Sequence, residues 1–330
     1  MFDMRRREFI ALLGGAAAAW PLAARAQQAK RPVIGFLSSG SPRAFAGFVE
    51  AFRQGLTDQG FVEGQNVLID YRWAEGRYHE LDPLAADLVR RQVDVLAATG
   101  GLVSAHAAKR ATTTIPVLFV AGYDPVKIGL VTSVSRPEGN LTGVSIITTE
   151  LAAKRLELLT ELVPGTRSLA ILVNPQGITT DIETNDTMAA AQDLKQTLLV
   201  FKASNDREIE AAFASAVLQQ ARALLVSADP LFTSRRAQIV ALAARNKLAA
   251  SYPFRNYVEG GGLMSYGTEL AWAYRHVGDY AGRIIKGADP RNLPVVMPTR
   301  FQLVINLKTA KALELEVPAT VLARADDVIE

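Results

Sequence analysis

The sequence lacks cysteine altogether and has only three histidines among its 330 residues. Without cysteine, the chain can form neither a disulfide framework nor a cysteine-linked lipid anchor. His79, His106 and His276 are far apart in the sequence and form no H-x-x-x-H pair, so the side chains that usually hold zinc are not gathered. We therefore expect no metal site and no cofactor.

The fingerprints of common enzyme classes are missing as well. Residues 35–40, GFLSSG, follow the spacing of neither the dinucleotide-binding G-x-G-x-x-G loop nor a close variant of it. Residues 262–267, GLMSYG, miss the G-x-S-x-G spacing of a nucleophilic serine by one position. We expect no catalytic residues and a protein that is not an enzyme.

The first 26 residues contain the three parts of an export signal. Residues 5–7 are arginines, residues 9–20 are mainly apolar, and residues 24–26, ARA, have the small-x-small pattern that signal peptidase accepts. The apolar stretch contains glycine and is shorter than the roughly 18 residues that span a bilayer. The arginine pair resembles a twin-arginine signal. We expect cleavage near Ala26 and a protein free in the periplasm, with a disordered basic tail as the alternative.

The balance of charge argues against a nucleic-acid partner. Removing residues 1–26 leaves 32 basic and 31 acidic side chains, which is a net charge of +1. Phosphate binding needs lysines and arginines clustered on one face, and the sequence shows no such cluster. We expect no nucleic-acid partner, no stable membrane insertion after signal removal, and a monomer.

Strand and helix patterns alternate along the rest of the chain. Short apolar runs predict strands at residues 32–37, 67–73, 93–98, 115–120, 169–173, 198–201, 223–226, 248–251, 263–266 and 301–305. Helical spacing predicts helices at residues 44–59, 80–91, 102–111, 149–162, 180–194, 206–219, 233–246, 269–286 and 308–314. Strands that alternate with helices of this length predict an α/β fold with parallel sheets.

The length predicts two lobes, because about 300 mature residues exceed what one hydrophobic core usually serves. The strand and helix rhythm restarts after residues 140–144. We expect an N-terminal lobe from residues 32–145 plus 262–290, with the glycines at 260–262 leading back into it. The C-terminal lobe is then 146–261 plus 291–330, although the sequence leaves open to which lobe residues 291–330 belong.

Candidate ligand-binding residues follow from the expected topology, because the ligand crevice of an open parallel sheet lies beyond the carboxyl ends of its strands. The residues just after the predicted strands give the candidates Ser38, Ser39, Thr99, Gly100, Gly101, Tyr123, Asp124, Asn174, Asp229, Phe232 and Tyr252. Small hydroxyls, backbone amides, acids and aromatic rings are thereby brought to one crevice.

These groups suit a zwitterion with an apolar side chain. Amides at Thr99, Gly100 and Gly101 begin a helix and favour a carboxylate. Asp229 or Asp124 is the candidate for the amine, and the aromatic rings for the solute's side chain. Asp-Pro after a strand is also ordinary turn and N-cap chemistry, so that interpretation stays open for both acids.

Six stretches carry a resemblance to a known family, and the match runs from Pro32 to Glu330. They are AFRQGL at 51–56, GFVEGQNV at 60–67, YRWAEG at 71–76, ATTTIP at 111–116, GLMSYG at 262–267 and LVINLKTA at 303–310. Together they resemble the substrate-binding proteins of ABC importers of the tryptophan and tyrosine transport type. The resemblance implies a type I periplasmic-binding-protein fold and ligand closure between hinged lobes.

Two positions depart from the family pattern in the expected crevice. Gly100 and Gly101 stand where the family commonly has a Thr-Pro or Ser-Pro turn, and Tyr123 stands where a glycine precedes the Asp-Pro-Val turn. Both departures bear on the aromatic amino-acid specificity that the resemblance implies, and the solute itself stays open.

The expected function is that of the solute-binding component of an ABC importer. It would capture a small amino-acid-like or aromatic solute between its lobes and deliver it to a membrane permease with its ATPase. A periplasmic ligand sensor for a membrane receptor and a periplasmic enzyme are the alternatives. Neighbouring genes for a permease and an ATPase, or for a receptor kinase, would separate transport from sensing.

Overall fold

Two sheets organise the residues that the computed structural model describes, which are 31–166 and 168–330. Both sheets belong to one compact unit, Val33–Glu330, and each sheet with the helices that cover it is called a lobe below. The export signal expected at residues 1–26 lies outside the described residues. The expected α/β fold with two parallel-sheet lobes is confirmed.

The first sheet has five parallel strands in the order β2-β1-β3-β4-β5. These strands are β1 (Val33–Ser38), β2 (Leu68–Trp73), β3 (Val95–Thr99), β4 (Val117–Ala121) and β5 (Leu141–Ser145). In register, Ile34 of β1 stands between Ile69 of β2 and Val95 of β3. Every residue of β3 and β4 is buried, because helices cover both faces of the sheet.

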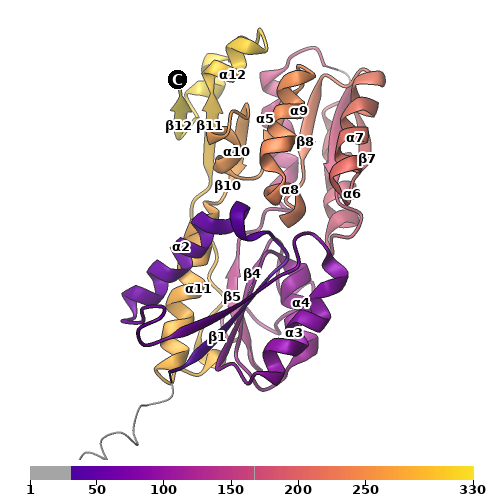
Figure 1. Cartoon of the computed structure of the whole chain (residues 1–330). Coiled ribbons are helices and arrows are strands. Elements are labelled where there is room, and N and C mark those ends of the chain that lie inside the picture. Colours follow the sequence, from indigo (N-terminus) through magenta and orange to yellow (C-terminus); the bar gives the residue numbers. More distant parts are fainter. Residues whose placement is uncertain (1–30, 167) are drawn as a thin grey trace, which may run out of the picture. The chain divides into compact units, whose positions relative to one another are not determined.

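Four helices form the two outer layers of the first lobe. They are α2 (Pro42–Asp58), α3 (Leu81–Arg90), α4 (Leu102–Ala111) and α11 (Leu270–Ile285), with a single 3-10 turn, η1 (Tyr78–Glu80), before α3. One hydrophobic cluster joins the sheet to α2 and α11, and another joins it to α3 and α4. Although α11 lies far along the sequence, it runs beside α2 (Figure 1).

Glycines let the backbones of α2 and α11 touch. A Cβ added at Gly55 would lie 2.0 Å from the carbonyl oxygen of Arg275, and one added at Gly278 would lie 2.0 Å from that of Phe52. No side chain fits in either gap. The contact therefore depends on glycine in both helices.

The second sheet has seven strands in the order β12-β11-β10-β9-β8-β6-β7. Its strands are β6 (Ser168–Val173), β7 (Thr197–Lys202), β8 (Ala223–Val226), β9 (Ala249–Tyr252), β10 (Met264–Gly267), β11 (Gln302–Asn306) and β12 (Asp327–Ile329). The run β7-β6-β8-β9-β10 is parallel and repeats the strand order of the first sheet. Strand β11 is antiparallel to β10 and parallel to β12.

Helices cover both faces of the second sheet. They are α5 (Ala152–Leu162), α6 (Thr180–Asp193), α7 (Asp206–Leu218), α8 (Pro230–Ser234), α9 (Arg236–Arg245), α10 (Arg255–Glu259), α12 (Leu307–Ala312) and α13 (Ala319–Leu322). The 3-10 turn η2 (Pro290–Asn292), which follows α11, belongs to the first lobe, where it packs against β5. One cluster packs α5, α6, α12 and α13 onto the sheet. A second contains α7 and α9 and is continuous with the α2 and α11 side of the first lobe.

The return to the first lobe begins later than expected. Residues 262–290 were expected in that lobe, but Met264 of β10 pairs with Ser251 of β9 and with Ile305 of β11. The main chain of this strand is thereby hydrogen-bonded within the second sheet. Only after Gly267 does the chain cross, so that α11 covers the first sheet.

The last crossing also differs from the expected boundary at residue 291. The Val295 N–H donates to the carbonyl oxygen of Val134 at 2.8 Å, and the Ser145 N–H donates to that of Val296 at 2.9 Å. Residues 291–296 therefore lie along the edge of the first sheet. The chain passes to the second sheet over residues 297–301, just before β11.

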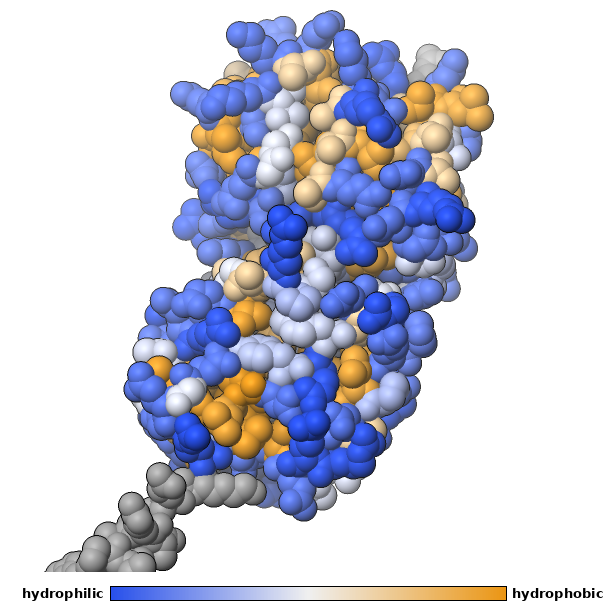
Figure 2. All heavy atoms as spheres, in the orientation of Figure 1, coloured by the Kyte–Doolittle hydropathy of each residue, from blue (hydrophilic) through white to orange (hydrophobic). Residues whose placement is uncertain are grey.

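The surface mixes polar and apolar side chains. On the face shown in Figure 2, hydrophobic residues form separate patches broken by hydrophilic ones on both lobes, as is normal for a surface in contact with water. Among the described residues, no helix has the length and apolar character needed to cross a membrane.

Substituting Gly278 tests the contact between α2 and α11. We expect Gly278→Ala to lower the free energy of unfolding by about 1–3 kcal/mol, because the new methyl group has to push the backbone of α2 away. Gly47→Ala is the matched control, since Gly47 is an exposed residue of α2 whose Cβ would meet nothing within 4 Å. That change should raise stability by about 0.5–1 kcal/mol. Denaturant unfolding measures both, and equal effects would contradict the contact.

Candidate ligand-binding site

A cavity lies between the two lobes, beyond the carboxyl ends of the central strands. Its space is about 650 Å³, including the part open to solvent. Its lining consists of Phe45, Gly100–Val103, Val120, Gly122, Leu270 and Tyr274 of the first lobe, Gly177–Thr179, Ala228–Pro230, Thr233 and Phe254 of the second, and Ile146, Thr148 and Thr149 of the first crossing.

The strand order places the cavity there. From the adjacent strands β1 and β3, the chain leads to α2 on one face of the sheet and to α4 on the other. The adjacent strands β6 and β8 likewise lead to α6 on one face and to α8 and α9 on the other. Loops that diverge in this way leave a crevice at the switch point of each sheet. The two crevices face one another across the cavity.

Helix N-termini from both lobes reach the cavity. Gly101 and Thr179 are the N-cap residues of α4 and α6, and both line the cavity wall. The first backbone N–H groups of a helix have no partner within the helix and carry partial positive charge. The two helices therefore offer amide donors from opposite sides.

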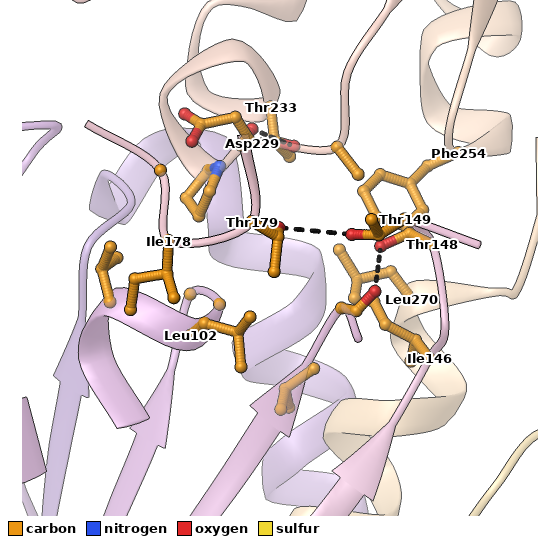
Figure 3. A pocket seen from close by; sticks show the side chains of 18 of the residues that line it. Leu102, Ile146, Thr148, Thr149, Ile178, Thr179, Asp229, Thr233, Phe254 and Leu270 are labelled. Carbon is orange, nitrogen blue, oxygen red and sulfur yellow. Dashed lines mark hydrogen bonds between the residues drawn. The ribbon is translucent and has the colours of Figure 1, made fainter. Parts of the chain in front are cut away.

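Threonines of the first crossing tie the wall to both lobes (Figure 3). The Thr148 hydroxyl donates to the carbonyl oxygen of Gly122 at 3.2 Å, and the Thr149 hydroxyl donates to the hydroxyl oxygen of Thr179 at 3.3 Å. Between β5 and these threonines, Ile147 has a φ of 42°, which is costly for a β-branched residue. The Ile146 N–H donates to the carbonyl oxygen of Ala121 at 2.7 Å, so hydrogen bonds before and after Ile147 hold the crossing in this strained conformation.

Asp229 is the charged residue of the cavity wall within the described part of the chain. Its Oδ1 accepts hydrogen bonds from the Tyr78 hydroxyl at 2.6 Å, the Leu231 N–H at 2.9 Å and Asn174 Nδ2 at 3.0 Å. Burial raises the pKa of this carboxyl above its ordinary value, although the hydrogen bonds favour its charged form. A cationic group beside Oδ2 would offset the cost of burying the charge.

The remaining wall is largely apolar. Leu102 and Ile178 approach from the two lobes on one side, whereas Phe254, Leu270 and Ile146 lie together on the other (Figure 3). Such a wall favours an aromatic or branched aliphatic side chain by burial of apolar surface. With Asp229, the cavity combines one acidic point with an apolar chamber.

A buried ion pair supports the cavity from behind. Arg155 of α5 is fully buried, and its Nη2 lies 3.1 Å from Glu183 Oε1 of α6. Its Nη1 donates to the carbonyl oxygen of Thr148 at 3.0 Å. Burial raises the pKa of Glu183, and the arginine opposes that rise. The pair thus links α5 and α6 to the first crossing.

Three of the residues predicted from sequence line the cavity: Gly100, Gly101 and Asp229. Asn174 does not line the cavity but donates a hydrogen bond to Asp229 Oδ1. The rule that ligands bind beyond the carboxyl ends of strands therefore located residues at the switch point of the sheet in each lobe.

Ser38, Ser39 and Thr99 are fully buried beneath the first-lobe loops and do not line the cavity. The Ser39 hydroxyl donates to the carbonyl oxygen of Gly100, and the Ser39 N–H donates to the Ser104 hydroxyl at 3.0 Å. These residues position the start of α4. They act as supports in the structure.

The other predicted residues lie away from the cavity lining. Phe232 and Tyr252 are buried in the core, where Tyr252 stacks on Tyr257 with 4.8 Å between ring centroids. Asp124 Oδ1 accepts from the Val126 and Lys127 N–H groups at 2.8 and 3.2 Å, which is turn chemistry. The ring of Tyr123 faces the amino group of Lys127 at 5.9 Å.

Sequence reasoning missed the residues that tertiary structure brings to the cavity. Thr148 and Thr149 belong to the crossing after β5, and Tyr274 comes from α11, which returns from the other lobe. Residues 177–179 come just before a predicted helix, and the free amides at a helix start could have marked them as candidate binding residues. Thr148 and Thr149 follow β5, which was not among the predicted strands, so the rule of residues after strands did not select them.

Comparison with known proteins gives one family and several relatives. The family model described as ABC transporter substrate binding protein matches residues 26–329. A tyrosine-binding protein of Clostridioides difficile (strain R20291) is 27% identical over 274 residues, which cover 83% of this chain and 77% of that protein.

Solved structures of similar chains include a liganded and a ligand-free form. The ABC domain in complex with L-Trp from Streptococcus pneumonia has a TM-score of 0.80 and 24% identity, covering 91% of this chain and 100% of that chain. The ligand-free, open structure of a substrate binding protein with adhesive properties from Clostridium difficile has a TM-score of 0.61 and 24% identity, covering 90% of this chain and 99% of that chain.

Removing Arg155 tests the support behind the cavity. We expect Arg155→Met to lower the free energy of unfolding by about 3–5 kcal/mol, because Glu183 is then buried without a partner. Lys154→Met is the control, since the neighbouring pair Lys154–Glu157 is partly exposed at 2.8 Å and should contribute about 1 kcal/mol or less. Denaturant unfolding compares the two. A loss no larger than that of the control would contradict the supporting role.

Proposed function

Because the chain belongs to the ABC transporter substrate binding protein family, we propose that it captures an amino acid with an aromatic or branched side chain and delivers it to the permease of an ABC importer. Its structural relatives share the type I periplasmic-binding-protein fold. The observation that carries the proposal is the cavity between the lobes, whose largely apolar wall includes one acidic residue, Asp229. A zwitterion with an apolar side chain is the small solute that matches this chemistry.

The ammonium group is proposed to bind Asp229 through Oδ2. Oδ1 already accepts three hydrogen bonds, from Tyr78, Asn174 and Leu231. A cation at the remaining oxygen compensates the charge that burial disfavours. Asp124, the other candidate for the amine, caps its own turn outside the cavity lining.

The carboxylate is proposed to bind the amides at the start of α4, at Gly101 and Leu102. These positions line the cavity, and glycine leaves the backbone open to a ligand. The hydroxyls of Thr148, Thr149 and Thr179 supply further polar groups on the same wall. The apolar side chain then lies among residues such as Phe254 and Leu270.

The relatives support an amino-acid ligand. One carries the name tyrosine-binding protein, and another was solved in complex with L-Trp. Tyr123, which departs from the family pattern, lies outside the cavity lining, so its bulk leaves an aromatic ligand room. Binding is non-covalent, and the closed form is stabilised because the ligand contacts both lobes.

Export is part of the proposal. Residues 1–26 read as a twin-arginine signal peptide, and the family match begins at residue 26. A chain cleaved near Ala26 would act in the periplasm as a monomer, where it meets both the solute and the permease.

Amino-acid binding is tested by thermal stability. We expect at least one aromatic or branched amino acid, present at about 100 times its dissociation constant, to stabilise the mature chain by about 2.7 kcal/mol. Differential scanning fluorimetry with a panel of amino acids, aromatic acids and nucleobases measures this shift. If no aromatic or branched amino acid stabilises the protein, the proposed ligand class is wrong.

The role of Asp229 is tested by removing its charge. We expect Asp229→Asn to weaken amino-acid binding by about 1.5–3 kcal/mol, because a charge-assisted hydrogen bond to the ammonium is lost. Asp124→Asn makes the same chemical change outside the cavity lining and should leave the affinity nearly unchanged. Isothermal titration calorimetry measures the amino-acid affinity of both variants. Unchanged affinity in Asp229→Asn would contradict the proposal that the ammonium group of the ligand binds Asp229.

A further inference from the structure

We propose that Tyr78, which does not line the cavity, is a positioning residue that latches the two lobes closed through Asp229. Tyr78 belongs to η1 of the first lobe, and Asp229 belongs to the N-terminus of α8 in the second. The ligand-coupled part of this inference rests on the proposed function. The latch itself is a property of the two lobes and can be measured without a ligand.

The hydroxyl of Tyr78 makes two hydrogen bonds across the lobes. It donates to Asp229 Oδ1 at 2.6 Å and accepts from the Leu231 N–H at 3.2 Å. The Leu231 N–H at the start of α8 is thus shared between Asp229 Oδ1 and the Tyr78 hydroxyl. Because the Tyr78 acceptor is a buried carboxylate, the bond is stronger than one between neutral groups.

The segment that carries Tyr78 is fixed to the first lobe just before it. The N–H groups of Ala74, Glu75 and Gly76 donate to the carbonyl oxygens of residues 38–40, at 2.8–3.1 Å. The predicted site residues Ser38 and Ser39 therefore hold the latch segment as well as the start of α4. Tyr78 thus projects from a rigid base.

Gly76 allows the second lobe to approach this segment. Its φ is 87°, and an added Cβ would lie 2.8 Å from Leu231 Cδ1. Two further contacts join the lobes nearby. Arg236 Nη1 donates to the carbonyl oxygen of Ala44 at 2.9 Å, and a Cβ at Gly101 would lie 3.1 Å from Pro230 Cγ.

These contacts define a closed arrangement of the lobes. Tyr78, Leu231 and Arg236 all lie outside the cavity lining, so opening the lobes breaks their contacts whether or not a ligand is present. The structure solved with L-Trp also matches this chain with a higher TM-score, 0.80, than the ligand-free, open structure does, 0.61. Tyr78 therefore contributes to the difference in free energy between closed and open forms.

Asp229 connects the latch to the ligand. One carboxylate oxygen holds Tyr78, and the other is the proposed partner of the ligand's ammonium group. The ammonium keeps the carboxylate ionised, and an ionised carboxylate accepts the Tyr78 bond more strongly. Ligand binding and lobe closure thus reinforce one another through a single side chain.

A cross-lobe disulfide measures closure without a ligand. In Gly76→Cys with Leu231→Cys the two Cβ positions are 4.0 Å apart, which suits a disulfide in the closed form alone. The chain has no other cysteine, so the pair reports on closure alone. We expect Tyr78→Phe in this background to slow disulfide formation about 10- to 100-fold, the factor expected for one hydrogen bond to a charged group.

Tyr280→Phe is the matched control for the cross-linking. The Tyr280 hydroxyl donates to the carbonyl oxygen of Pro294 at 2.8 Å, within the first lobe. The same atom is removed, but no bond between the lobes is lost. Disulfide formation should stay within about twofold of the parent pair. Equal rates in Tyr78→Phe and Tyr280→Phe would overturn the latch.

Ligand kinetics in the cysteine-free protein provide the second measurement, which also decides if the cysteine pair fails to fold. We expect Tyr78→Phe to raise the dissociation rate of a bound amino acid about 10- to 100-fold. The ratio of affinities for L-tryptophan and L-phenylalanine should be unchanged, because the cavity wall is intact. Phe254→Leu should change that ratio, since Phe254 lines the cavity.

The outcomes separate the latch from the proposed function. If the wild-type protein binds no amino acid, the proposed function fails, and the cross-linking rates still decide the latch. If amino acids bind and Tyr78→Phe changes neither the dissociation rate nor the cross-linking rate, the latch is overturned while the proposed function stands. A changed affinity ratio in Tyr78→Phe would place Tyr78 in ligand recognition and also overturn the latch.

Discussion

The backbone contact between α2 and α11 is the constraint on which the site depends. Gly55 and Gly278 bring the two helices together with no side chain between them. To make this contact, the chain must leave the second sheet after β10, cover the first sheet with α11, and cross back before β11. Helix α11 thereby carries Leu270 and Tyr274 to the cavity. The packing of one lobe thus fixes part of the wall shared by both.

Tyr274 shows how this packing reaches the ligand side. Its hydroxyl accepts a hydrogen bond from the Gly100 N–H at 3.1 Å, while Ser39 holds the Gly100 carbonyl from the opposite side. Gly100 is therefore held on one side by Tyr274 of α11, which comes late in the sequence, and on the other by Ser39 of the loop after β1, which comes early. These two contacts are called the clamp. A fixed backbone at this point keeps the following amides aimed at the cavity, which lowers the cost of ordering them when a ligand binds.

Local patterns predicted the elements, but the allocation of elements to lobes needed tertiary information. The helix expected at residues 102–111 has those bounds in the structure, since its apolar spacing and flanking glycines are local signals. The strand at Met264–Gly267 was also expected, yet apolar residues alone do not say which sheet they join. Short elements such as α10 and β12 were missed because a few residues carry too little periodicity.

The candidate site was likewise predicted only in part from the sequence. The rule that ligands bind beyond the carboxyl ends of strands found Gly100, Gly101 and Asp229. It also selected Phe232, because the rule gives a position along the chain and not the direction in which a side chain points. Thr148 was missed because the strand before it, β5, was not among the predicted strands, and Tyr274 was missed because it lies on a helix. Their place in the wall follows from packing between segments far apart in sequence.

The glycines at 100 and 101 show why a departure from the family pattern can preserve the chemistry of the site. Both have positive φ, and a Cβ at Gly100 would lie 2.7 Å from the Ser38 hydroxyl. A Thr-Pro or Ser-Pro turn would supply a hydroxyl here but could not adopt this backbone. Glycine gives up that hydroxyl and exposes amides instead, while Thr148 and Thr149 provide hydroxyls from the crossing. Capture of a carboxylate then depends on backbone geometry, which the clamp by Ser39 and Tyr274 maintains.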